Sequence, residues 1–282
     1  MKKISIDDRM KDFYEVRNRR FLTRRTPVII RIDGKAFHTY TRGLNKPFDE
    51  GLMEDMQLTT KYLCENIQGC KFGYVQSDEI SLLLTDYDTL QTDAWFDYCQ
   101  NKMESIAASM ATGFFLKQRI LRAISISEDG NWIKDYIEEV KVAEFDARAF
   151  NIPKEDVANY FIWRQQDATK NSISMLAQSL YSHKELQGKN GDQMQEMCFQ
   201  KGTNWNNIGT SKKRGTACYK AVGKKDLTGK IPLEKLQQNR DPKDPIWEED
   251  GRYGIYTASF VLDNETPIFS SNLGRTLIEI LI

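Results

Sequence analysis

The chain has few histidines and cysteines, and none of its apolar runs is long. Only two of its 282 residues are histidine and five are cysteine. The cysteine number is odd and no C-x-x-C spacing occurs, which argues against both a disulfide framework and a zinc site. No apolar run approaches the roughly 20 residues of a membrane helix, and the charged N-terminus has no apolar signal core. We therefore expect no membrane partner and a reducing, cytoplasmic environment.

The net charge of the chain is zero, because 40 Lys and Arg residues balance 40 Asp and Glu residues. Any attraction to nucleic acid must therefore come from how the charges are distributed. Basic residues gather in 17–25 and 212–225. Such runs suit a phosphate backbone, although a run of like charges is more often a solvated face.

Hydrophobic periodicity and β-branched residues predict alternating strands and helices over residues 27–148. The expected order is strand 27–34, helix 49–67, strands 72–76 and 80–84, helix 92–122 and strand 141–148. This order is typical of the ferredoxin-like βαββαβ arrangement, an antiparallel sheet with two helices on one face. We therefore expect an α+β fold in which the first and third strands form the central pair.

Additional helices and strands are expected on both sides of this unit. Residues 1–26 predict a basic surface helix, and 153–181 predict a long helix. A polar loop with one short helix is expected over 187–210, and strands over 216–222 and 253–261.

Two acids are expected to meet at one edge of the predicted sheet. Asp33 ends the first strand, and Asp78 lies in the turn between the second and third strands. A pair of Mg²⁺ ions that catalyses nucleotidyl transfer needs at least two such carboxylates close together. Gly34 would give a phosphate room and offer its carbonyl as a ligand, and the amides of 35–38 could hold a triphosphate. The alternative is that each acid belongs only to a turn, the common role of Asp-Gly after a strand.

Six short motifs, taken together and in this order, resemble the tRNA-His guanylyltransferase superfamily. The motifs are 31–38 (RIDGKAFH), 46–47 (KP), 76–79 (QSDE), 145–148 (FDAR), 163–167 (WRQQD) and 213–216 (KRGT). The resemblance covers most of the chain from about residue 25 to residue 220. Chance agreement of so many ordered motifs is improbable.

The resemblance implies a polymerase-type palm that adds nucleotides to the 5′ end of tRNA, opposite in direction to ordinary polymerases. ATP or GTP would activate a 5′-monophosphate on the acceptor stem, and the 3′-hydroxyl of an incoming nucleotide would then attack it. Pyrophosphate would be removed last. The implied partners are tRNA, nucleoside triphosphates, two Mg²⁺ ions and further copies of the chain in a homotetramer.

The resemblance also implies roles for individual residues. Asp33 and Asp78 would be catalytic and would hold both metal ions together with Gly34, and Glu79 would support the metal site. The nucleotide would be held by Asp33, Gly34, Lys35, Ala36, Phe37, His38, Lys46, Ser77 and Asp78, and tRNA would be contacted by Asn171, Lys213 and Arg214.

One motif departs from the family. After the segment that matches residues 163–167, members dedicated to tRNA-His carry His-Ile-Asn-Asn, whereas this chain has Thr169-Lys170-Asn171-Ser172. The missing histidine favours the branch of the family that resembles template-dependent repair polymerases acting on 5′-truncated tRNA. Addition of the extra 5′ guanosine to tRNA-His is the alternative.

Two further hypotheses remain open at the level of sequence. A nucleotide cyclase can be built on the same palm, and a non-catalytic RNA-binding module can share the βαββαβ fold, although the aromatic RNA-binding motif of such modules is missing here. For the domains, we expect a catalytic domain over 1–150 and an extension over 151–240 that completes it and contacts tRNA. Residues 241–282 form a segment of unclear role.

Overall fold

The computed structural model describes residues 4–126, 141–238 and 245–282. Two compact units can be distinguished. The first comprises Met1–Cys218 and Leu262–Ile282, and the second comprises Tyr219–Val261. The sequence-based division at 150 and 240 stays a prediction. Among the described residues, no helix combines the length and the apolar character needed to cross a membrane.

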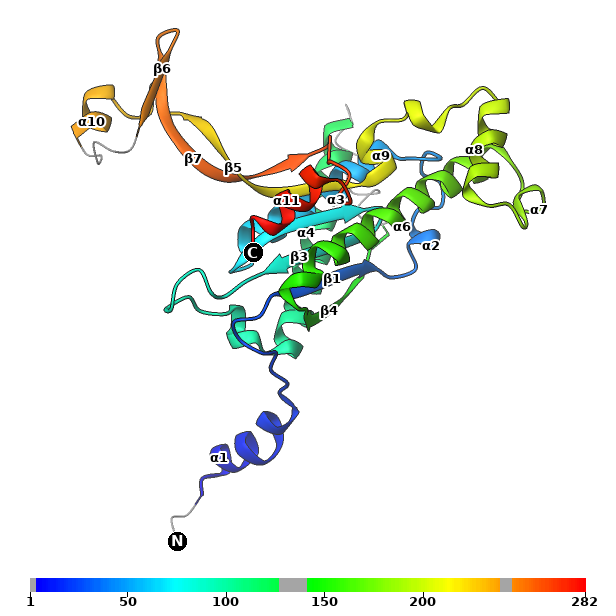
Figure 1. The fold of residues 1–282 in the computed structure, drawn as a ribbon. Coiled ribbons are helices and arrows are strands. Elements are labelled where there is room, and N and C mark those ends of the chain that lie inside the picture. Colours follow the sequence, from blue (N-terminus) through cyan, green and yellow to red (C-terminus); the bar gives the residue numbers. More distant parts are fainter. Residues whose placement is uncertain (1–3, 127–140, 239–244) are drawn as a thin grey trace. The chain divides into compact units, whose positions relative to one another are not determined.

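The first unit is built on an antiparallel sheet (Figure 1). Its strands are β1 (Val28–Gly34), β2 (Cys70–Gln76), β3 (Glu79–Leu84) and β4 (Phe145–Asn151). β1 pairs with both β3 and β4, and β2 pairs with β3, so these four strands lie in the order β4-β1-β3-β2. The expected central pair of first and third strands is therefore confirmed.

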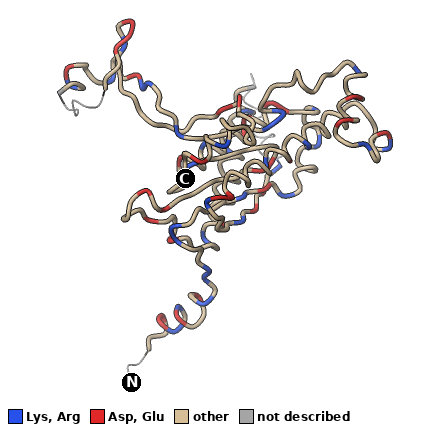
Figure 2. Tube along the Cα trace, viewed as in Figure 1, with Lys and Arg blue, Asp and Glu red and all other residues tan. Residues whose placement is uncertain are grey.

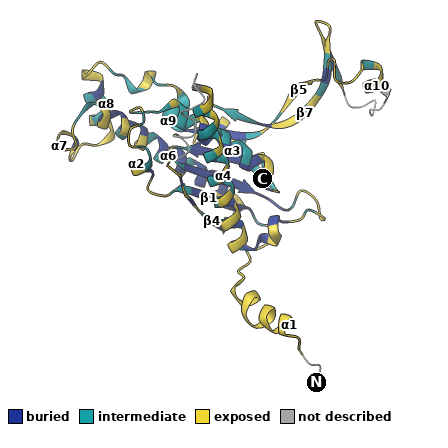
Figure 3. Ribbon diagram, turned by 180° about the vertical axis from the view of Figure 1, so that it is seen from behind, coloured by how far each residue is buried: buried dark blue, intermediate teal, exposed yellow. Residues whose placement is uncertain are grey.

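Helices cover both faces of this sheet. α3 (Glu50–Asn66) and α4 (Gln100–Ile126) pack against each other and against β2 and β4, whereas α6 (Lys154–Leu180) lies on the opposite face (Figure 1). Because side chains of β1 and β3 are enclosed on both sides, these strands consist of nearly continuous apolar residues. Figure 3 shows β1 as largely buried and α1 (Ile6–Met10) as exposed.

Shorter elements complete the first unit. α1 continues through a π-helical turn at Lys11–Glu15 and a 3₁₀ turn at Val16–Asn18, so a helical segment forms within the expected range 1–26. Among the described residues of this unit, the remaining helices are α2 (Phe37–Tyr40), α7 (His183–Leu186), α8 (Gly191–Gln200), α9 (Thr210–Arg214) and α11 (Asn272–Glu279), with 3₁₀ turns at Trp95–Tyr98 and Trp205–Asn207.

The second unit is formed around a two-stranded hairpin of β6 (Ile246–Glu249) and β7 (Arg252–Asp263). α10 (Leu233–Gln238) and the part of β5 (Thr216–Asp226) from Tyr219 onward are its other described elements. Its core contains the side chains of Leu227, Leu236, Trp247 and Phe260, all of which are buried.

Two expected boundaries were wrong. The helix predicted from residue 92 begins only at Gln100, because Phe96, Asp97 and Tyr98 have positive φ angles that no α-helix accommodates. The strand predicted over 141–148 occupies Phe145–Asn151 instead. The polar loop with one short helix that was expected over 187–210 is confirmed, because α8 lies within it and has a first turn closed by a reciprocal capping box between Asn190 and Gln193.

Gly215 should be difficult to replace by any other residue. It has a φ of 75° and a ψ of −173°, and a Cβ there would lie 2.5 Å from the carbonyl oxygen of Val75. We expect Gly215→Ala to lower the free energy of unfolding by about 1–3 kcal/mol or more, measured by urea denaturation. Gly209→Ala is the matched control, because its Cβ would meet no atom within 4 Å. Equal effects of the two variants would contradict this account.

Candidate functional site

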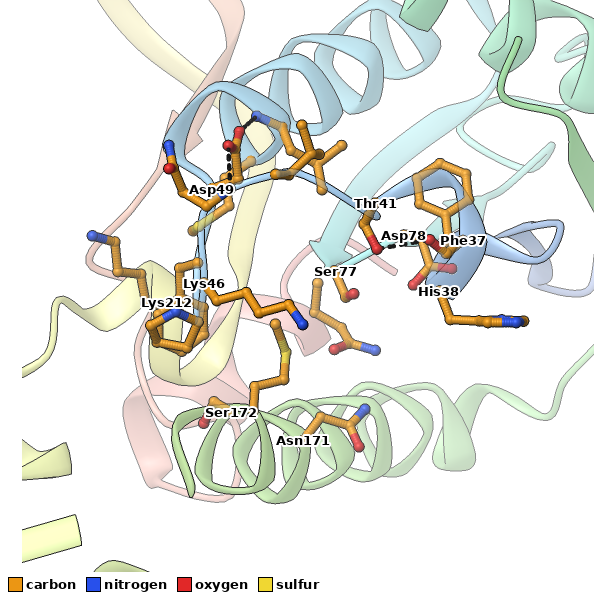
Figure 4. A pocket seen from close by; sticks show the side chains of 18 of the residues that line it. Phe37, His38, Thr41, Lys46, Asp49, Ser77, Asp78, Asn171, Ser172 and Lys212 are labelled. Carbon is orange, nitrogen blue, oxygen red and sulfur yellow. Dashed lines mark hydrogen bonds between the residues drawn. The ribbon is translucent and has the colours of Figure 1, made fainter. Parts of the chain in front are cut away.

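A cavity of about 730 Å³ lies where the ends of the central strands meet α6 and α9 (Figure 4). Its lining includes Gly34 from β1, the segment from Ala36 to Asp49, and the β2–β3 turn at Ser77 and Asp78. α6 and α9 supply the opposite wall. This volume is within the range of sites for ligands of nucleotide size.

The register of the sheet brings the predicted acids together. Asp33 on β1 lies opposite Glu79 on β3, and the amide of Gly34 donates to the carbonyl oxygen of Asp78 at 3.1 Å. Burial raises the pKa of the Asp78 carboxyl, and the negative charge of Asp33 raises it further. Two carboxylates are therefore held close enough to repel each other, as the sequence predicts.

The backbone at this site is strained at two residues that are not glycine. Ala36 has a φ of 52° and Ser77 has a φ of 51°, which places both in the left-handed region. Such conformations cost on the order of 1–3 kcal/mol each and cluster at functional sites. Among the described residues, the amides of Ala36, Phe37 and His38 donate to no protein acceptor, so they are available to a ligand.

The ring of Phe37 belongs to the core, although sequence reasoning placed this residue among the nucleotide contacts. It packs against the rings of Tyr40, Phe115 and Phe145, with centroids 4.9–6.0 Å apart. A Cβ on Gly34 would lie 2.2 Å from this ring, which explains the need for glycine after Asp33. Any contact of Phe37 with a ligand must therefore come mainly from its backbone.

Basic side chains also line the cavity. Lys46 extends into the cavity (Figure 4), and His38 also lines it. Sequence reasoning missed Arg42 in the loop after α2, and it missed Lys212 on α9 as a lining residue. Lys212 forms an ion pair with Glu50 at 2.8 Å. The sequence did offer a signal for Arg42, because this positive charge lies next to Gly43 in the same loop as Lys46.

Asp33 is not in the lining of this cavity, and three other predicted contacts also have side chains that do not line it. Lys35 points to Glu144, with which it forms an ion pair at 2.5 Å. Lys213 donates to the carbonyl oxygen of Asn206 at 2.7 Å and lies over the ring of Trp205. Arg214 uses its carbonyl oxygen to accept a hydrogen bond from Tyr74. Asn171, in contrast, lines the cavity from α6, as Figure 4 shows.

Glu79 does not line the cavity but holds two arginines behind it. It is 5% exposed and accepts hydrogen bonds from Arg31 at 2.6 Å and from Arg164 at 2.8 Å. Arg31 also lies 3.6 Å from the carboxylate of Asp33. Burial raises the pKa of Glu79, and the two guanidinium groups oppose this shift. Glu79 therefore orients the cation that neighbours Asp33.

The oxygen ligands at this site fit hard divalent cations. Within the part of the chain that the structure describes, no group of three or more His, Cys, Asp or Glu side chains could hold a metal ion. The site offers two carboxylates, those of Asp33 and Asp78, and the carbonyl oxygen of Gly34 beside them. Mg²⁺ is commonly bound by one or two carboxylates while substrate phosphates complete its coordination, so the residues fit this use.

Replacing Asp78 by asparagine should stabilise the free protein, because it removes a buried charge repelled by Asp33. Folding raises the pKa of Asp78, so its ionised carboxylate lowers the stability of the folded protein at higher pH. This cost disappears as the pH falls and the carboxyl is protonated. We expect Asp78→Asn to raise Tm by about 2–4 °C at pH 7.5. The difference should shrink in scans at pH 4, and a lower Tm at pH 7.5 would contradict the account.

Comparison with known proteins identifies the family. Residues 7–153 match the model of the family described as tRNAHis guanylyltransferase. The chain is 40% identical to a bacterial tRNA(His) guanylyltransferase-like protein solved in complex with ATP, with a TM-score of 0.75 and 99% of each chain covered. A bacterial complex with GTP is 39% identical, with a TM-score of 0.70 and 98% coverage of each chain.

A curated relative agrees with these matches. The tRNA(His) guanylyltransferase of Debaryomyces hansenii is 27% identical over 242 residues, which cover 79% of this chain and 83% of that protein. Since the family model matches more than half of the chain and the bacterial structures match nearly all of it, the chain belongs to the tRNA(His) guanylyltransferase family of nucleotidyltransferases.

Proposed function

We propose that the chain is a magnesium-dependent nucleotidyltransferase that adds nucleotides to the 5′ end of tRNA, in the 3′-to-5′ direction. The observation that carries this proposal is the carboxylate pair Asp33 and Asp78 at the ends of paired strands, beside a cavity of nucleotide size. The similarity to bacterial proteins solved with ATP and with GTP supports nucleoside triphosphates as the occupants.

Different residues of the site suit metal ions and phosphate groups. Asp33, Asp78 and the carbonyl of Gly34 would hold two Mg²⁺ ions, which neutralise the charge that develops on attacking and leaving oxygens. The free amides at 36–38 and the ammonium of Lys46 suit the phosphates of ATP or GTP. The strand order β4-β1-β3-β2, with acids at the end of its central pair, supports a polymerase-type palm.

Two finer functions are compatible with this chemistry. The names of the relatives favour guanosine addition to tRNA-His, which sequence reasoning placed second. Template-dependent repair is favoured by Thr169, which replaces the family histidine on α6 and donates its hydroxyl to the carbonyl of Gln165 at 3.0 Å. Ser172 in the same segment is buried and accepts from the indole of Trp205, and both Asn171 and Ser172 line the cavity. The homotetramer stays a prediction from the resemblance.

Removal of one metal ligand should abolish nucleotide addition. We expect Asp33→Asn to lower the rate by about a hundredfold or more, because even partners that only orient a metal ligand are typically worth 10–100-fold. The assay is magnesium-dependent transfer of labelled nucleotide to 5′-monophosphorylated tRNA-His. The control is Asp192→Asn, an exposed carboxylate of α8. Normal activity of Asp33→Asn would show that this pair is not the metal site.

The choice of nucleotide separates the two finer functions. We expect tRNA-His variants with each of the four bases opposite the added position to receive guanosine, as the names of the relatives indicate. Each nucleoside triphosphate is supplied separately, and the labelled product is resolved on a sequencing gel. Incorporation of the complementary nucleotide opposite every base, also on a second truncated tRNA, would establish templated repair instead.

A further inference from the structure

The structure divides the N-terminal basic run into arginines with and without carboxylate partners. Arg19 pairs with Glu15 at 3.2 Å, and Arg24 pairs with Asp86 at 2.5 Å and with Asp97. Among the residues that the structure describes, Arg17 and Arg20 have no carboxylate partner, and both side chains are exposed. Figure 2 shows basic and acidic positions interspersed along the described parts of the chain. Arg25 is also exposed and has no ion pair among the described residues, so three cations of this run remain available to a ligand. Arg17 and Arg20 are two of them.

These two arginines line a second cavity, which we call the arginine groove. It has a volume of about 740 Å³ and shares no lining residue with the cavity beside Asp78. Its other walls come from the first turns of α4 and from β4. The described lining consists of Arg17, Asn18, Arg20, Gln100, Asn101, Glu104, Ser105, Ala108 and Ala147.

Main-chain hydrogen bonds hold this basic segment against the start of α4. The amide of Leu22 donates to the carbonyl of Tyr98 at 3.0 Å, and the amide of Gln100 donates to the carbonyl of Arg20 at 2.8 Å. Phe21 forms an antiparallel bridge with Cys99 between these two bonds. The backbone of Arg20 is thus fixed beside the groove, so binding a ligand would order mainly its side chain.

The polar groups on the floor of the groove are already occupied. Glu104 is the one acidic side chain in the described lining, and its Oε1 accepts from the side chain of Gln100 and from the amide of Ala149, each at 2.9 Å. Asn101 donates its side-chain amide to the carbonyl of Asn18. The two guanidinium groups therefore determine the chemistry of a ligand, which should be anionic.

We propose that the arginine groove binds backbone phosphates of the substrate RNA, an inference that rests on the proposed function. Guanidinium groups match phosphate oxygens in a bidentate geometry. The described lining has no aromatic ring on which a base could stack, which favours an RNA backbone over a free nucleotide. The two cavities are linked by α4. Ala108 lines the groove, and Phe115, seven residues later and roughly 10 Å further along the helix, packs on Phe37 of the first cavity. A short RNA stem could therefore reach both sites.

The test compares tRNA binding by the wild type and by the double variant Arg17→Ala/Arg20→Ala. We expect its Kd for tRNA to rise about tenfold or more, because each arginine loses a charge-assisted hydrogen bond. The slope of log K against log salt should fall in magnitude by about 1.4–1.8, because each of the two lost phosphate contacts contributes roughly 0.7–0.9 to it. The Kd for ATP should not change, and a thermal melt confirms that the variant is folded.

Arg25→Ala is the matched control. Arg25 is exposed, lies in the same basic run and does not line the groove. An equal loss of tRNA affinity in the control would show general attraction to a basic surface and would overturn the inference. A matching loss of ATP affinity in the double variant would overturn it too, and would assign the groove to a nucleotide. Failure of the wild type to bind tRNA would instead refute the proposed function.

Discussion

The antiparallel pairing of β1 with β3 is the constraint on which the functional site depends. Six residue pairs fix its register, from Val28 opposite Leu84 to Asp33 opposite Glu79. The hydrogen bond from Gly34 to Asp78 extends the contact one step beyond the strands. Because side chains alternate between faces, a shift of one residue would turn Asp33 to the opposite side of the sheet. The buried apolar residues of both strands therefore also specify where the carboxylates meet.

The same register separates two acids that are neighbours in the sequence. Asp78 lies in the turn and faces the cavity, whereas Glu79 is directly opposite Asp33 and is buried. Arg31 precedes Asp33 by two residues, so it lies on the same face of β1 and reaches both Asp33 and Glu79. Arg164 from α6 completes the neutralisation of Glu79. One acid is thus left poorly compensated in the cavity while the other is neutralised behind it.

Sequence reasoning predicted the features that follow from local patterns and missed those that depend on tertiary contacts. The observed bounds of the buried strands and of the long helices α3 and α6 are close to the predicted ones, because the spacing of apolar residues follows from which side chains are buried. The late start of α4 was missed, since positive φ angles at residues such as Phe96 leave no hydrophobic signal. Arg42 and Lys212 enter the cavity from segments far apart in sequence, and the pairing of Lys35 with Glu144 depends on β4 lying beside β1.

A chain with no net charge can nevertheless offer cations to a polyanion, because ion pairing is distributed unevenly over its arginines. Arg122 and Arg164, for example, are paired with buried or partly buried carboxylates and add to packing rather than to the outward field. Among the described residues, Arg17, Arg20 and Arg42 have no such partner, and each lines a cavity. Composition therefore understates the capacity for phosphate binding, which depends on the cations left unpaired after folding.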